Sequence, residues 1–105
     1  MSKQLVVLAV LVTSLSAFAA DPCAGLPTHA QLKAALVAAR GQDNGGFNLD
    51  MWGTVVARTG EVCAVAFTGK DAGSQWPGSR VISAQKANTA NAFGLPGLAL
   101  ATANL

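Results

Sequence analysis

The sequence predicts a mixed α+β domain in which helices pack against an antiparallel β-hairpin. Two segments carry apolar residues at helical spacing, and between them two short runs of β-branched residues flank a Gly-containing turn. The chain has 105 residues, and its apolar N-terminal segment is expected to be removed. About 86 residues then remain, which is room for one small domain.

Residues 1–19 have the pattern of a secretory signal peptide. Lys3 precedes an apolar run at residues 5–12, and Ala17 and Ala19 supply the small residues at −3 and −1. We expect cleavage after Ala19 and a periplasmic or secreted product. The apolar run is eight residues long, whereas a membrane span needs roughly 20.

Residues 28–40 are predicted to form the first helix. Thr28 is a good N-cap, and Gln31 three residues later completes a capping box. Arg40 and Gly41 mark the end of the helix. Lys33 is expected to point away from the core. The predicted buried stripe has i, i+3, i+4, i+7 spacing and consists of Leu32, Ala35, Leu36 and Ala39.

Residues 51–57 and 62–67 are predicted to form the two strands of the hairpin. Alternation places Val62, Ala64 and Ala66 on one face of the second strand. The opposite face carries Cys63, Val65 and Phe67. Because neither face is polar, both faces of the sheet need to be covered.

A polar, Gly-rich loop at residues 68–78 precedes a second predicted helix, for which Ser79 is the expected N-cap and Phe93 the end. Small residues form a ridge along this helix that allows close packing, namely Ser83, Ala87, Ala90 and Gly94. The bulky residues expected to fill the core are Val81, Ile82 and Phe93. Residues 94–97 break the helix, and residues 98–105 are predicted to begin a third.

Composition and charge restrict the function. Without Lys3 the chain keeps six basic and five acidic residues, a net charge of +1, which gives no electrostatic reason to expect nucleic acid or an anionic membrane as partner. The predicted mature chain holds 18 alanines and 21 larger apolar residues, so the core is thin. Small domains of this kind depend on disulfides, ligands or partner subunits.

Cys23 and Cys63 are the two cysteines of the chain. In an exported protein they are expected to form a disulfide, which would close a loop of about 41 residues and stabilise the fold by roughly 4 kcal/mol. Free buried thiols, or a redox or metal-binding role, are the alternatives.

The sequence contains none of the usual catalytic or covalent haem-attachment motifs, such as CxxC, CxxCH, HExxH, GxSxG or a P-loop. His29, the single histidine, is expected in the first turn of the first helix, as a surface or capping residue or alternatively as a ligand or acid–base group. A non-catalytic role is therefore favoured, and an enzymatic one stays open.

Trp76 lies in the polar loop, next to Pro77 and shortly before a helix. This setting suits an aromatic wall of a ligand site, and burial in the core is the alternative, as it is for Trp52. Arg80 and Lys86 project from the following helix and are candidates to pair with ligand carboxylates, unless they only solvate that helix.

Residues 52–67 and 76–93 resemble the GlcG/HbpS family of small haem-binding proteins. The family pattern comprises a hairpin with a Gly-containing turn, a polar loop, a helix with the block K-A-x-T-A-x-x-F, and a short helix opened by Pro. Here these are Arg58-Thr59-Gly60, the block from Lys86 to Phe93, and Pro96. The resemblance extends over residues 28–105.

The resemblance implies a profilin-like antiparallel sheet with packed helices, non-covalent haem binding and a homo-oligomer. The family domain continues into further strands, so residues 20–105 would be a domain incomplete at its C-terminus. The predicted haem site consists of Trp76, Arg80, Lys86 and Thr89. The alternative function is a structural or partner-binding accessory protein without a small-molecule ligand, with Trp76 and the small-residue ridge as its interface.

Overall fold

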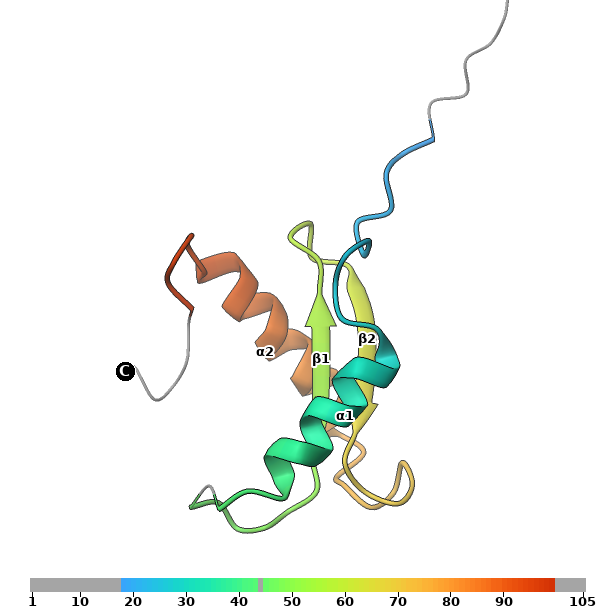
Figure 1. Cartoon of the computed structure of the whole chain (residues 1–105), viewed down its shortest axis with the longest axis vertical. Helices are drawn as coiled ribbons and strands as arrows, with labels where there is room; N and C mark the ends of the chain where they lie inside the picture. Colours follow the sequence, from blue (N-terminus) through green and yellow to red (C-terminus); the bar gives the residue numbers. More distant parts are fainter. Residues whose placement is uncertain (1–17, 44, 100–105) are drawn as a thin grey trace, which may run out of the picture.

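The computed structural model describes residues 18–43 and 45–99. Its elements are α1 (His29–Arg40), β1 (Trp52–Val56), β2 (Val62–Phe67) and α2 (Ser79–Phe93), a mixed α+β fold as predicted. Figure 1 shows the hairpin at the centre with α1 and α2 packed against it. Most of the predicted signal peptide, residues 1–17, lies outside the described residues.

The capping box predicted at the start of α1 is confirmed. Gln31 donates its backbone N–H to Thr28 Oγ1 at 3.3 Å, and Thr28 donates its own to Gln31 Oε1 at 2.9 Å. At the other end, the Gly41 N–H donates to the carbonyl of Val37. Both ends of α1 therefore lie where the sequence places them.

The predicted apolar stripe of α1 is only partly correct. Leu32 and Leu36 are half-buried, but Ala35 and Ala39 are exposed. Lys33, expected to point into solvent, is half-buried instead. Its Nζ donates to the Phe67 carbonyl and lies 4.5 Å from the centre of the Phe67 ring. The long aliphatic stem of a lysine makes this possible, because it packs on apolar surface while the ammonium finds polar partners.

β1 and β2 form the predicted antiparallel hairpin. Trp52 pairs with Phe67, and Thr54 with Val65, before the register shifts between Val55 and Val56. Gly60 in the turn has φ +92°, a conformation that side chains other than glycine disfavour.

The two helices cover opposite faces of this sheet. A Cβ at Gly53 would come within 2.6 Å of Leu36 Cδ1 in α1, whereas the Oγ atoms of Thr54 and Ser83 in α2 are 2.8 Å apart. Because neighbouring residues of a strand face opposite ways, these two contacts place α1 on one side of β1 and α2 on the other. The predicted need for cover on both faces is thus met by one helix on each.

The core is as thin as the composition suggests. Among the described residues, the buried apolar side chains are those of Ala57, Ala64 and Ala66. Ala66 lies opposite Gly53 in the hairpin, and Ala64 lies opposite Val55, so both belong to the face that α1 covers. Two of the three buried alanines therefore lie between α1 and the sheet.

The start and side-chain directions of α2 differ from the prediction. Gly78 is the N-cap and Ser79 the first helical residue, whose Oγ donates to the Trp76 carbonyl at 2.7 Å. Val81 and Phe93 are 64% and 70% exposed, so they do not supply core bulk as expected. Ile82 is half-buried. The small-residue ridge is half-buried and faces β1, and it comprises Ser83, Ala87, Ala90 and Gly94.

The segment after α2 forms a tight turn. Leu95 and Leu98 exchange two backbone hydrogen bonds of 3.1 and 2.9 Å, with Gly97 at φ +78°. The predicted third helix therefore does not begin at Leu98. Residues 100–105, the rest of that prediction, lie outside the described part of the chain.

Candidate functional site

A groove of about 290 Å³ lies between β1 and α2. Part of its lining comes from the start of β1. The rest comes from one side of α2, because residues at positions 79, 82, 83 and 86 share one side of a helix. The lining residues are Met51, Trp52, Ser79, Ile82, Ser83 and Lys86. The groove thus combines apolar side chains with hydroxyls and one cation.

The indole of Trp52 forms the aromatic wall of this groove. Its ring meets that of Phe67 edge-on, with centroids 5.2 Å apart, and its Nε1 donates to the Trp76 carbonyl at 3.0 Å. The guanidinium carbon of Arg80 lies 5.8 Å from the ring centre, within cation–π range. Contacts with three residues therefore fix the orientation of the ring.

The four predicted cofactor-binding residues are only partly brought together. Arg80 lies beside Trp52, and Lys86 lines the groove. Trp76 is 69% exposed and does not belong to the lining, and its ring lies over Gly78, where a Cβ would be 2.8 Å from the indole. Thr89 lies outside the lining too, and its Oγ1 donates to the Gln85 carbonyl at 3.0 Å.

The loop before α2 is held by one buried polar side chain, Gln75, which is 3% exposed. Its Oε1 accepts from the Gly69 N–H at 3.1 Å, and its Nε2 donates to the Asp71 carbonyl at 2.7 Å. These two bonds fix the backbone of the loop, and with it the position of the Trp76 carbonyl that accepts from Trp52. The sequence offers no periodic signal for Gln75, because its role depends on the loop closing on itself.

Met51 is held in place at the open end of the hairpin, opposite Thr68. Its N–H donates to Thr68 Oγ1 at 3.0 Å, and that hydroxyl donates to Asp50 Oδ1 at 2.8 Å. Asp50 in turn pairs with Arg40 at 3.4 Å. This chain of contacts links the end of α1 to the entrance of the groove.

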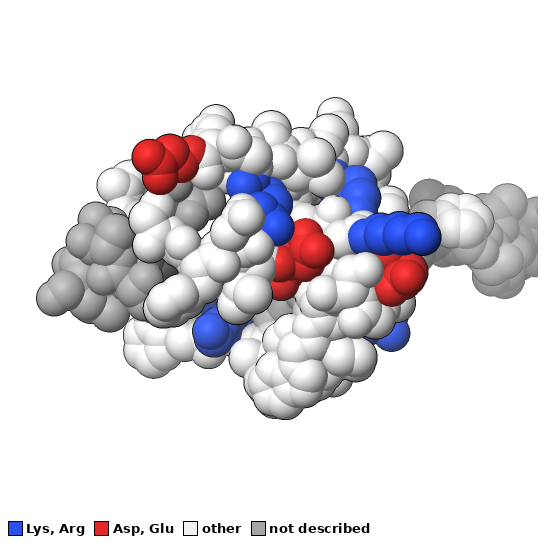
Figure 2. Space-filling view, turned by 90° about the horizontal axis from the view of Figure 1, so that it is seen from below, with Lys and Arg blue, Asp and Glu red and all other residues white. Residues whose placement is uncertain are grey.

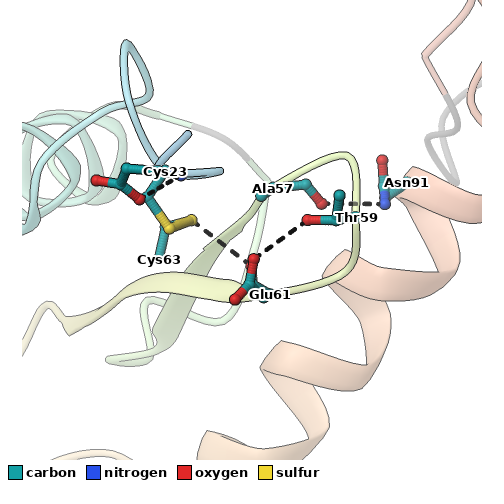
Figure 3. Close-up of a disulfide and its surroundings, with 7 residues drawn as sticks. Cys23, Ala57, Thr59, Glu61, Cys63 and Asn91 are labelled. Carbon is teal, nitrogen blue, oxygen red and sulfur yellow. Dashed lines mark hydrogen bonds between the residues drawn. A yellow bond between two sulfur atoms is a disulfide. The ribbon is translucent and has the colours of Figure 1, made fainter. Parts of the chain in front are cut away.

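Cys23 and Cys63 form the predicted disulfide, with Cα atoms 5.5 Å apart. This excludes free thiols at both positions. Figure 3 shows the bridge beside the hairpin turn, with Asn91 of α2 approaching the turn from the other side. The pairing fits an oxidising compartment.

Arg58 and Asn91 attach the hairpin turn to the end of α2. Arg58 donates to the carbonyls of Asn91 and Gly94 at 2.6 and 3.2 Å, and Asn91 Nδ2 donates to the Ala57 and Arg58 carbonyls. A guanidinium at the C-terminal end of a helix also complements the helix dipole. These bonds set how α2 lies on β1, and so they position the groove.

Charged groups are few and of mixed sign. On the face shown in Figure 2, basic and acidic side chains are interspersed among uncharged ones. His29 is exposed at the start of α1. Within residues 18–43 and 45–99, no group of three His, Cys, Asp or Glu side chains is placed to hold a metal ion, and no helix is long and apolar enough to cross a bilayer.

No protein-family model, curated protein or solved structure matches the chain. The resemblance to the GlcG/HbpS family therefore stays a prediction.

Proposed function

We propose that the chain is an exported, non-catalytic domain that binds haem or a related tetrapyrrole without a covalent bond. The observation that supports this is the groove between β1 and α2, where Lys86 lies in the lining and Arg80 lies beside the indole of Trp52. The GlcG/HbpS resemblance implies the same ligand class.

The groove has the chemistry that haem requires. A tetrapyrrole needs an apolar wall and positive charge for its two propionates. Trp52 and Ile82 offer the wall, and Arg80 and Lys86 offer the charge from one helix. The volume of about 290 Å³ is at the lower end of small-molecule pockets, which begin at roughly 300 Å³, so one edge of the macrocycle would enter and the rest would lie outside.

The groove offers no strong ligand for the iron. His29 lies at the start of α1, outside the lining, and both cysteines are joined in the disulfide. We therefore expect modest affinity and a weak, replaceable bond to the iron.

The place of action would be the periplasm or the cell exterior. The disulfide between Cys23 and Cys63 supports an oxidising compartment, and residues 1–19 supply the predicted export signal.

Haem titration followed by absorbance tests the proposal. We expect a Soret shift with the parent protein and binding at least five-fold weaker in a variant with both Arg80→Ala and Lys86→Ala. Lys70→Ala is the matched control, because Lys70 is an exposed cation outside the groove. Absence of a Soret shift in the parent contradicts haem binding. Equal affinity of the double variant and the control contradicts the site.

A second candidate function, binding of a protein partner, is favoured by a different observation. Three alanines are the buried apolar residues of the described chain, whereas many large apolar side chains are exposed, among them Phe47, Leu49, Trp76, Val81, Phe93 and Leu95. A protein surface of this kind commonly serves association.

A further inference from the structure

Four side chains form a row across the open end of the hairpin and join α1 to the groove. Lys33 of α1 has its Nζ 4.5 Å from the centre of the Phe67 ring, which meets the Trp52 ring edge-on at 5.2 Å. The guanidinium carbon of Arg80 in α2 lies 5.8 Å from the centre of the Trp52 ring. Two aromatic rings therefore lie between two cations, one from each helix.

Lys33 reaches this row from the other side of the sheet. Trp52 and Phe67 lie directly opposite each other in the hairpin, so their side chains share one face of the sheet. This is the face toward α2, because Thr54, two residues along β1, contacts Ser83 of α2. Lys33 belongs to α1, which covers the opposite face. Its side chain therefore passes the outer edge of β2 to reach the Phe67 ring.

The ammonium group of Lys33 is itself fixed. Its Nζ donates to the carbonyls of Phe67 and of Gly69, the latter at 3.4 Å, and the residue is half-buried. A cation is attracted to the electron-rich face of an aromatic ring. Because two carbonyls hold the ammonium, it restrains the Phe67 ring instead of moving with it.

We infer that Lys33 is a positioning residue of the groove, which holds the Phe67 ring and, through this ring, the indole of Trp52. The inference rests on the proposed function in taking the groove as the ligand site. Neither Lys33 nor Phe67 belongs to the lining, so both contacts persist when a ligand enters. Holding the indole in place before binding lowers the entropy that binding costs.

Arg80, the other cation beside the indole, cannot hold the ring in this way during binding. It is a proposed partner of the ligand propionates, and a guanidinium that turns to a carboxylate gives up its contact with the ring. Lys33 stays bound to its two carbonyls. The indole therefore depends on the Lys33 side of the row when Arg80 is engaged.

Indole N–H resonances of the oxidised chain, recorded by NMR without haem, test the inference. Lys33→Met keeps the apolar stem and removes the ammonium. We expect the Trp52 resonance to move and the Trp76 resonance to stay, because the Trp76 ring lies over Gly78, outside the row. Lys33→Arg restores a cation and should return the Trp52 resonance toward its parent position. A Trp52 resonance that Lys33→Met does not move overturns the proposal.

Phe67→Leu separates the ring from the carbonyl. It removes the ring but keeps the backbone carbonyl that Lys33 bonds, so a merely structural role of Lys33 at the end of β2 is retained. In the Phe67→Leu background, Lys33→Met should leave the Trp52 resonance nearly unchanged. A movement as large as in the parent background overturns the proposal. If Lys33→Met does not fold, the parent decides, because absence of cross-relaxation between the Lys33 ε-protons and the Phe67 ring overturns it too.

Haem titration separates this inference from the proposed function. Where the parent binds haem, Lys33→Met should weaken binding about three-fold, the effect of one partly exposed cation–π contact. Lys70→Met is the matched control and should bind as the parent does, because Lys70 is exposed and outside the row. Equal affinity of Lys33→Met and the parent overturns the inference and leaves haem binding standing. A parent without a Soret shift contradicts the proposed function, and the indole resonances then decide the role of Lys33.

Discussion

The two faces of the hairpin are covered by helices in different ways. On the α1 face, Leu36 lies against Gly53, and Ala66 beside it is fully buried. On the α2 face, the ridge of small residues packs on β1, Thr54 and Ser83 are joined by a hydrogen bond, and a groove remains. A large side chain such as Leu36 fills the space against a glycine of the sheet, whereas a ridge of small residues beside a polar contact leaves space for a groove.

Loss of the disulfide should lower the free energy of unfolding more than any single substitution at the contacts between helices and sheet. The loss concerns the α1 side, because the bridge anchors the segment before that helix. Replacing Cys23 and Cys63 by serine frees a loop with a sequence separation of 40 residues. We expect a loss of about 4 kcal/mol in the free energy of unfolding, because the unfolded chain gains entropy. Chemical denaturation measures it, with the reduced parent as control. Unchanged stability would contradict this.

A single methyl group at position 53 tests whether the α1 face is closed by shape. In Gly53→Ala the new Cβ meets Leu36 at 2.6 Å, and we expect destabilisation by about 2 kcal/mol from overpacking. Gly41→Ala is the control, because the nearest atoms there lie 3.6 Å away. Thermal unfolding compares the two. Equal midpoints would show that the face tolerates extra volume.

On the α2 face, Arg58→Met removes the bonds to the Asn91 and Gly94 carbonyls. The expected loss is about 1 kcal/mol, since these bonds are exposed and water replaces them. Arg80→Met, which removes only the contact with Trp52, should cost less. If Arg58→Met lowered the free energy of unfolding more than Gly53→Ala did, the α2 face and not the α1 face would be the more sensitive to a single substitution.

Local signals in the sequence predict the elements well. The capping box of α1, the hairpin and the end of α2 all follow from neighbouring residues, and the cysteine pair follows from their number and the expected export. Helical spacing predicts that Lys33 points into solvent, because it does not register a lysine that reaches a neighbouring strand. The preference of serine for N-cap positions predicts Ser79 there, but the N-cap is Gly78.

The candidate site was predictable only in part. The sequence indicates Arg80 and Lys86, because both are cations on a helix that follows a Gly-rich loop. It does not indicate Trp52 and Met51, because their place in the groove depends on how α2 crosses β1. That crossing is set by Arg58 and Asn91, which are 33 residues apart in the sequence and carry no shared pattern.

The bridge between Cys23 and Cys63 also decides how the molecule responds to mechanical load. A pull on the N-terminus reaches the sheet through the sulfur atoms at β2 before it reaches α1, which begins at His29. Both α1 and β1 lie between the two cysteines and are thereby shielded, and β2 bears the tension. While the bridge is intact, α1 lies within a closed loop that the pull cannot extend.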